Sequence, residues 1–177
     1  AYGKPVFNYF REEHKLNLAE LLGTLSDCLE NTVLQDNNLS VIKHSPEFAS
    51  NKSPETPTNR ILTSLLCRNR LAFILQHGLT YVRSNQSMIQ KHIMRYPQLF
   101  ATLAIEKHLA EGGKKGVIWH TQGSGKTALA YYNTRYLTHY YAKQGIVPKF
   151  YFIVDRLDLL KQAQREFTAR DLIVHTI

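Results

Sequence analysis

The residues best suited to do chemistry lie in one glycine-rich run, residues 116–127, which reads Gly-Val-Ile-Trp-His-Thr-Gln-Gly-Ser-Gly-Lys-Thr. A short apolar stretch opens it, and residues 128–141, which contain neither Pro nor Gly, follow it and predict a helix. An apolar strand, a glycine turn, Lys-Thr and a helix, in that order, make up a phosphate-binding loop. Gly123 and Gly125 matter because glycine lets the backbone N–H groups turn toward phosphate oxygens. We call residues 120–125 the glycine loop.

The polar residues at the end of this run have separate tasks in nucleotide binding. Lys126 is expected to reach the β- and γ-phosphates of ATP, and the Thr127 hydroxyl is expected to ligate Mg²⁺. The helix N-terminus adds partial positive charge. The alternative is a glycine turn that precedes Lys-Thr by chance, and His120 stands where the general pattern has Gly or Ala. The predicted phosphate-binding set is Gln122, Gly123, Ser124, Gly125, Lys126 and Thr127.

The run resembles motif I in the restriction (R) subunit of type I restriction–modification enzymes, a family in which His and Gln commonly occupy the positions of His120 and Gln122. Residues 95–101, Arg-Tyr-Pro-Gln-Leu-Phe-Ala, resemble the segment whose Gln reads adenine in superfamily 2 helicases, which implies that Arg95 and Gln98 bind adenine. The resemblance covers residues 58–177. Residues 152–162 are similar to the family's motif Ia, with Asp155, Arg156, Asp158 and Gln162 in place.

The resemblance implies a function for a longer parent enzyme. That enzyme would use ATP and Mg²⁺ to translocate double-stranded DNA and would cleave it, in a complex with methyltransferase and specificity subunits. Motif Ia would lie toward the DNA. The carboxylate that holds Mg²⁺ in such motors belongs to a later Asp-Glu motif, and no Asp-Glu pair follows Lys126. We therefore expect this chain to be a piece of that enzyme, with no catalytic residue of its own and no activity alone.

The charge of the chain favours a polyanionic partner. The net charge is +8, and residues 56–105 contain no Asp or Glu but six Arg or Lys. Nucleic acid is the first partner to expect from this pattern, and a basic but otherwise ordinary domain is the alternative. Cys28 and Cys67 are too few for a disulfide framework. No signal peptide or long apolar run is present, so we expect a soluble, cytoplasmic protein with no membrane partner.

Three parts of the chain must position these residues. Residues 1–45 predict a mainly helical N-terminal segment, for which the end of an upstream nuclease domain is one reading. Residues 46–57 are rich in Pro, Ser, Asn and Thr and predict a linker. Residues 58–177 predict the truncated beginning of the first helicase-like motor domain. Trp119 is expected in its core, and the tyrosines of residues 131–141 are expected to form a packed face.

The expected fold of the third part is α/β. Its helices are predicted at residues 59–66, 86–95, 98–109, 126–142 and 158–167, and its strands at 116–119, 149–154 and 172–177. From residue 116 the order is βαβαβ, which predicts a parallel sheet with right-handed crossovers. With the resemblance, this order indicates the start of a RecA-like motor domain.

Two other functions are compatible with the phosphate-binding pattern. One is the nucleotide-binding part of another DNA-dependent helicase-like ATPase. The other is a P-loop kinase, which shares Gly-Lys-Thr. A kinase would lack the motif Ia residues Asp155, Arg156 and Asp158. It would also lack a basic segment without Asp or Glu such as residues 56–105. Stimulation of ATP hydrolysis by duplex DNA would distinguish these functions.

Overall fold

The structure of the chain is a computed structural model that describes residues 10–12, 21, 27–53, 57–83 and 89–175. It divides into two compact units, one spanning Phe10–Phe73 and the other beginning at Ile74. Much of the predicted helical N-terminal segment, at residues 1–9, 13–20 and 22–26, lies outside the described residues. The three-part division of the chain at residues 45 and 57 stays a prediction.

The first unit is built from short helices: α1 (Asp27–Asp36), the 3-10 helix η2 (Ser40–His44), α2 (Pro46–Lys52), α3 (Pro57–Leu66) and α4 (Arg68–Phe73). The nearly buried carboxylate of Glu30 on α1 pairs with Lys52 and Lys43. Arg70 donates to both carboxylate oxygens of Glu12, at 2.7 and 3.0 Å. These charged groups supplement a small apolar core.

Helix α2 lies inside the segment that the sequence predicts as a linker. The Ser45 hydroxyl accepts a hydrogen bond from the Phe48 backbone N–H at 3.1 Å, and Pro46 occupies the first turn. Ser at the N-cap and Pro in the first turn are helix-start signals. The expectation of a loop at residues 46–52 is therefore wrong. Ser45 and Pro46 stand at positions where their residue types favour the start of a helix, and residues 46–52 form α2.

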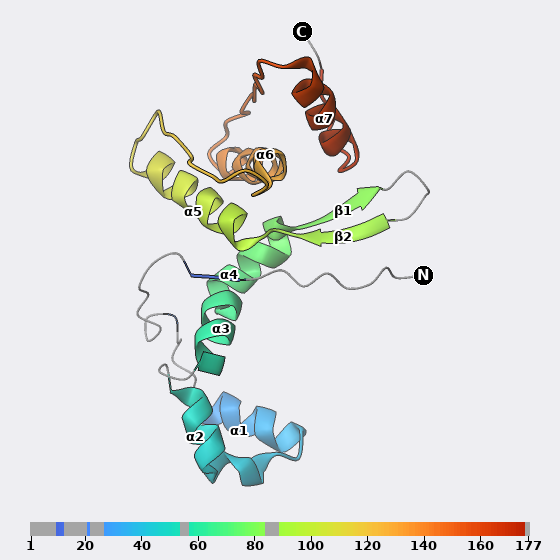
Figure 1. Ribbon diagram of the computed structural model, residues 1–177. Coiled ribbons are helices and arrows are strands. Elements are labelled where there is room, and N and C mark those ends of the chain that lie inside the picture. The colour runs from blue at the N-terminus through green and yellow to red at the C-terminus, as the bar shows by residue number, and fades with distance from the viewer. Residues whose placement is uncertain (1–9, 13–20, 22–26, 54–56, 84–88, 176–177) are drawn as a thin grey trace. The chain divides into compact units, whose positions relative to one another are not determined.

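The second unit contains the π-helical turn η3 (Ile74–Gly78), strands β1 (Leu79–Arg83) and β2 (Ile89–Ile93), and helices α5 (Tyr96–Ala110), α6 (Lys126–Ala142) and α7 (Leu157–Thr168). Helix α6 contacts both α5 and α7 (Figure 1). The predicted helices at residues 98–109, 126–142 and 158–167 are thus confirmed. The core of this unit lies along α6, where Leu129, Tyr131, Tyr132 and Tyr136 are buried, as expected for the tyrosines.

The two strands form an antiparallel hairpin with Leu79 opposite Ile93 and Arg83 opposite Ile89. The predicted helix at residues 86–95 is wrong, since residues 89–93 form β2. The ladder continues past its end, because the Met94 N–H donates to the Gly78 carbonyl at 2.7 Å. Residues 89–93 have a β-branched residue at each end and pair with β1. This pairing outweighs the helical tendency of the residues around them.

The parallel sheet is the part of the prediction that the structure does not contain. Residues 116–119, 149–154 and 172–175 are described but form no strand. A strand requires a partner that completes its hydrogen-bond ladder, whereas apolar periodicity requires none. Val117, Trp119 and Ile153 are 90–91% exposed. The expectation that Trp119 packs in the core is therefore wrong for this structure.

Candidate nucleotide-binding site

The glycine loop leads directly into the N-terminus of α6. Gly123 and Gly125 have φ angles of +76° and +82°, in the left-handed region. Lys126 is the first residue of α6, and the Leu129 N–H donates to the Gly125 carbonyl at 2.9 Å. The loop therefore places backbone N–H groups and the positive end of a long helix at one point, an arrangement suited to an anion.

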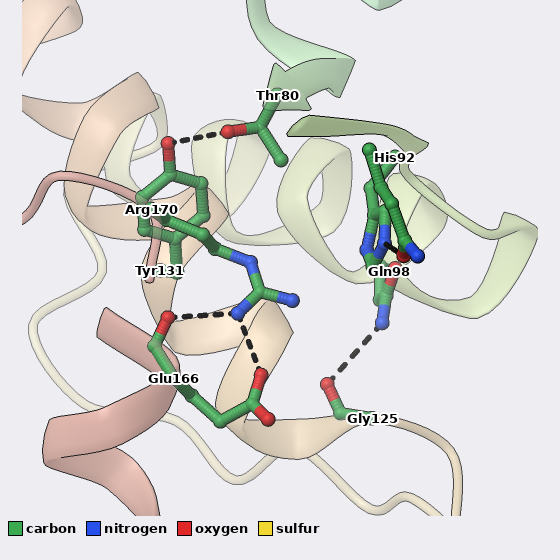
Figure 2. Close-up of polar contacts among 8 residues, drawn as sticks. Thr80, His92, Gln98, Gly125, Tyr131, Glu166 and Arg170 are labelled. Carbon is green, nitrogen blue, oxygen red and sulfur yellow. Dashed lines mark hydrogen bonds and ion pairs between the residues drawn. The ribbon is translucent and has the colours of Figure 1, made fainter. Parts of the chain in front are cut away.

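The first turn of α5 holds the glycine loop through two side chains. The Arg95 guanidinium donates from Nη2 to the Gly123 carbonyl at 3.0 Å. The Gln98 amide donates from Nε2 to the Gly125 carbonyl at 3.2 Å, as Figure 2 shows, and lies 3.5 Å from the Ser124 carbonyl. Gln98 Oε1 accepts from the Arg95 backbone N–H at 2.9 Å. We call Arg95 and Gln98 the α5 clamp.

The clamp leaves no room for a side chain at Gly125. A Cβ atom built there would lie 2.5 Å from Gln98 Nε2 and 3.2 Å from Arg95 Nη2. Nothing lies within 4 Å of a Cβ built at Gly123. A side chain at Gly125 would therefore be strained by the backbone conformation and would also displace the ends of Gln98 and Arg95, whereas one at Gly123 would be strained by the conformation alone.

Lys126 points back into the glycine loop. Its exposed Nζ donates to the His120 and Thr121 carbonyls, at 3.2 and 3.0 Å. A flexible ammonium group held only by backbone carbonyls can exchange them for phosphate oxygens at little cost. Buried Ser124 Oγ and His120 Nδ1 have no hydrogen-bond partner among the described residues. Buried polar atoms are normally paired, so these two fit a site that takes a polar ligand.

Gln98 is only 3% exposed, which limits what it can bind in this conformation. Its amide nitrogen faces the glycine loop and its amide oxygen faces the Arg95 backbone. Contact with the edge of adenine would require the side chain to turn or a base to enter beside the loop. The adenine-binding role of Arg95 and Gln98 stays a prediction.

The motif Ia residues lie at and near the start of α7. Exposed Arg156 and Asp158 pair with each other through two hydrogen bonds of 2.7 and 3.1 Å. Gln162 lies one turn further along α7, where Asp158, Lys161, Gln162, Arg165 and Glu166 line a shallow surface hollow. The described contacts thus bring the α5 clamp and the glycine loop together, while Arg156 and Asp158 contact each other.

Sequence reasoning predicted Arg95, Gln98 and the glycine loop as binding residues but missed that the two side chains hold the loop. The spacing of Arg95 and Gln98 could have indicated the clamp, because the two residues are three positions apart at the start of a predicted helix, with Pro97 between them. Residues with this spacing share one face of a helix. The second missed feature is the polar group joining the hairpin to α6 and α7. Thr80 bonds to Tyr131 at 2.8 Å, and Arg170 pairs with Glu166 and lies over the Tyr131 ring (Figure 2).

Comparison with known proteins shows which family part of the chain resembles. Residues 91–172 match the family described as "Type III restriction enzyme, res subunit", which is a RecA-like helicase motor domain. That family fold supports the predicted α/β class at the level of the motor domain. The matched segment begins in β2 and contains the α5 clamp, the glycine loop and the motif Ia residues.

The curated relatives are more specific. An endonuclease subunit of a type I restriction enzyme from Staphylococcus aureus is 28% identical over 172 residues, which is 91% of this chain and 17% of the relative. One from Staphylococcus saprophyticus is 38% identical over 74 residues, which is 42% of this chain and 8% of the relative. A third, from Methanocaldococcus jannaschii and named for the same subunit, is 37% identical over 91 residues, which is 49% of this chain and 8% of the relative.

These matches confirm the resemblance to the R subunits of type I restriction enzymes. The chain spans less than a fifth of the length of each of these relatives. No solved structure matches the chain. Among the helices of the described residues, none is long and apolar enough to cross a membrane.

Proposed function

We propose that this chain supplies the ATP phosphate-binding part of a type I restriction enzyme R subunit. The parent protein would couple ATP hydrolysis to translocation of double-stranded DNA and to endonucleolytic cleavage. It would act in a complex with methyltransferase and specificity subunits. The observation that carries the proposal is the clamped glycine loop at the N-terminus of α6, within a segment related to R subunits.

The proposed roles follow from the chemistry of each group. The backbone N–H groups of residues 122–126 would bind phosphate oxygens, and Lys126 Nζ would leave the His120 and Thr121 carbonyls for the β- and γ-phosphates. Thr127, at the second position of α6, would hold Mg²⁺, which neutralises phosphate charge when it is bound. Arg95 and Gln98 would contact adenine. Asp155, Arg156, Asp158 and Gln162 would face the DNA side of the motor.

The test is ATP hydrolysis by the full-length protein with Lys126→Ala. The variant should lose hydrolysis because the ammonium group of Lys126 is the charge expected to reach the β- and γ-phosphates. Lys143→Ala is the matched control, since it removes an equally exposed lysine at the opposite end of the same helix. Hydrolysis at the parental rate by Lys126→Ala would show that the site is misassigned.

The same assay separates the rival functions. A DNA translocase should hydrolyse ATP faster when duplex DNA is added, whereas a P-loop kinase should respond to a small acceptor molecule. Another DNA-dependent ATPase would be stimulated by DNA but would not cleave it. Loss of both stimulation and cleavage in Lys126→Ala, with both retained in Lys143→Ala, is the result that this proposal requires.

A further inference from the structure

The β1–β2 hairpin presents one face to solvent. Because side chains alternate along a strand, Leu79, Tyr81 and Arg83 of β1 share a face with the cross-strand residues Ile93, Lys91 and Ile89 of β2. We call these six residues the outer face. Tyr81 is 59% exposed and Ile89 is 63% exposed, and Arg83 and Lys91 are also exposed. A large aromatic ring, two branched apolar residues and two cations thus lie together at the surface.

The hairpin is anchored through one side chain of its other face and through the backbone edge of β1. Buried Thr80 bonds to the Tyr131 hydroxyl of α6 at 2.8 Å. The Leu79 carbonyl accepts from Arg135 Nη1 of α6 at 2.7 Å, and the Arg83 N–H donates to the Ala169 carbonyl, just after α7, at 2.8 Å. These three contacts fix the hairpin on α6 and α7, so the outer face is held in place and does not depend on an isolated two-stranded ribbon being stable.

The outer face carries positive charge only. Lys91 Nζ lies 5.8 Å from the centre of the Tyr81 ring, so the cation and the aromatic ring form one contact surface. Arg83 has one acidic neighbour, Asp171, at 3.5 Å, and both side chains of that pair are about two-thirds exposed. An ion pair so exposed contributes little, which leaves Arg83 able to bind another anion.

From this arrangement we propose that the outer face of the hairpin is a binding surface for the sugar–phosphate backbone of double-stranded DNA, without sequence preference. Arg83 and Lys91 are diagonal neighbours across the two strands, which places their Cβ atoms somewhat closer than the roughly 7–8 Å typical of such a diagonal. That separation is comparable to the distance between neighbouring phosphates of one DNA strand. The width of a two-stranded ribbon also fits the major groove of B-DNA.

Charge and shape together favour duplex DNA over an acidic protein. Carboxylates of an acidic protein could pair with Arg83 and Lys91, but their spacing varies from one partner to another. A duplex provides a periodic row of phosphates for Arg83 and Lys91 and apolar sugar and methyl groups for Tyr81 and Ile89. The surface is separate from the glycine loop, so the inference goes beyond the proposed nucleotide site and can fail independently of it.

The test measures binding of the full chain to a fluorescein-labelled 30-base-pair duplex of random sequence, by fluorescence anisotropy in the absence of nucleotide. The Arg83→Gln/Lys91→Gln double variant should bind roughly tenfold more weakly or worse at 0.1 M salt. The slope of log K against log salt concentration should fall by about 1.8, because each lost phosphate contact removes about 0.9. Tyr81→Ser should weaken binding without changing the slope.

A second double variant, Lys107→Gln/Lys143→Gln, is the control, because it removes the same charge from exposed positions on α5 and at the end of α6. It should retain parental affinity to within about twofold. Circular dichroism melting curves confirm that the variants fold, and binding of a fluorescent ATP analogue should be equal in all of them. Failure of that nucleotide binding in the parental chain would argue against the proposed function alone.

The inference is overturned by three results. The first is that the parental chain does not bind the duplex. The second is that the hairpin variant loses no more affinity than the control. The third is that the hairpin variant loses binding to a single strand of equal length, or to polyglutamate, while it keeps duplex binding.

Discussion

Replacement of Gly125 by alanine tests the α5 clamp directly. The added methyl group faces two problems, because Gly125 has a φ angle of +82° and because its Cβ would lie 2.5 Å from Gln98 Nε2. The backbone conformation cannot change freely, since the Gly125 carbonyl receives both the Leu129 N–H and the Gln98 amide. The Gln98 side chain must therefore move away from the loop.

The cost has two components. An alanine in the left-handed region costs about 1–2 kcal/mol. Moving the Gln98 amide breaks its bonds to the Gly125 and Ser124 carbonyls, and the shorter of these contributes about 1 kcal/mol. The sum predicts a loss of roughly 2–3 kcal/mol in the stability of the loop conformation. Gly123→Ala carries only the first component, because nothing lies within 4 Å of its Cβ.

Urea unfolding followed by circular dichroism measures the global stability, and hydrogen exchange of the backbone amides of the glycine loop measures local opening that the helical signal does not detect. Gly145→Ala is a second control, since it has a φ angle of +72°, open space around its Cβ and a position outside the loop. Gly125→Ala should destabilise the loop most, and the two controls, Gly123→Ala and Gly145→Ala, should cause smaller losses of stability that are similar to each other.

A double-mutant cycle checks the cause. If the clash with Gln98 produces the extra cost, Gly125→Ala should cost about 1 kcal/mol less when Gln98 is already alanine. The reasoning is refuted if Gly125→Ala and Gly123→Ala destabilise the loop equally. It is also refuted if the effects of Gly125→Ala and Gln98→Ala simply add.

Three further predictions concern single side chains. Gln98→Ala should narrow the preference of the full-length protein for ATP over GTP, and unchanged selectivity in competition binding would remove Gln98 from the adenine site. Burial raises the pKa of Tyr132 from 10.0 to about 12. The contribution of its neutral phenol to the free energy of unfolding is therefore present below pH 10 and is lost as the pH rises toward 12, by about 3 kcal/mol. The urea stability of Tyr132→Phe should depend less on alkaline pH, and an unchanged dependence would contradict the assignment. Burial is the main cause that lowers the pKa of His77 below 6.5, and the nearby His139 is the next. The contribution of His77 to the free energy of unfolding is therefore present above pH 6.5 and is lost as the pH falls. His77→Phe should show a smaller difference in stability between pH 7.5 and pH 5, and an equal difference in both proteins would contradict this prediction.

Periodicity and motif spacing were sufficient to predict the elements that carry the site. Helices α5, α6 and α7 were predicted close to their observed bounds because each has a recognisable start, at Pro97, Lys126 and Asp158, and no Pro or Gly follows within it. The glycine loop was predicted from its glycines and from Lys126. Glycine at a position that requires positive φ is visible in a sequence, since few other residues occupy such positions.

The features that were missed depend on pairing between distant residues. Residues 89–93 form a strand only because residues 79–83 pair with them. The local sequence pattern, which predicts a helix, contains no information about that pairing strand. The reverse holds for residues 116–119 and 149–154, whose apolar periodicity predicts strands that have no ladder in the structure. The clamp at Gly125 joins residues 27 positions apart, beyond the range of local pattern.

Helix α6 connects the two surfaces to which we assign functions. Lys126 begins the helix at the glycine loop, and Tyr131 and Arg135 hold the hairpin on its side. A rise of about 1.5 Å per residue places Lys126 and Arg135 roughly 13 Å apart along the helix axis. The contacts that hold the hairpin on α6 involve Tyr131 and Arg135, whereas Arg95 and Gln98 hold the glycine loop, so the two sets of contacts share no residue. Substitutions on the outer face of the hairpin should therefore leave the glycine loop intact, and Lys126→Ala should leave the hairpin intact, so that nucleotide binding and duplex binding can be measured as separate properties of one unit.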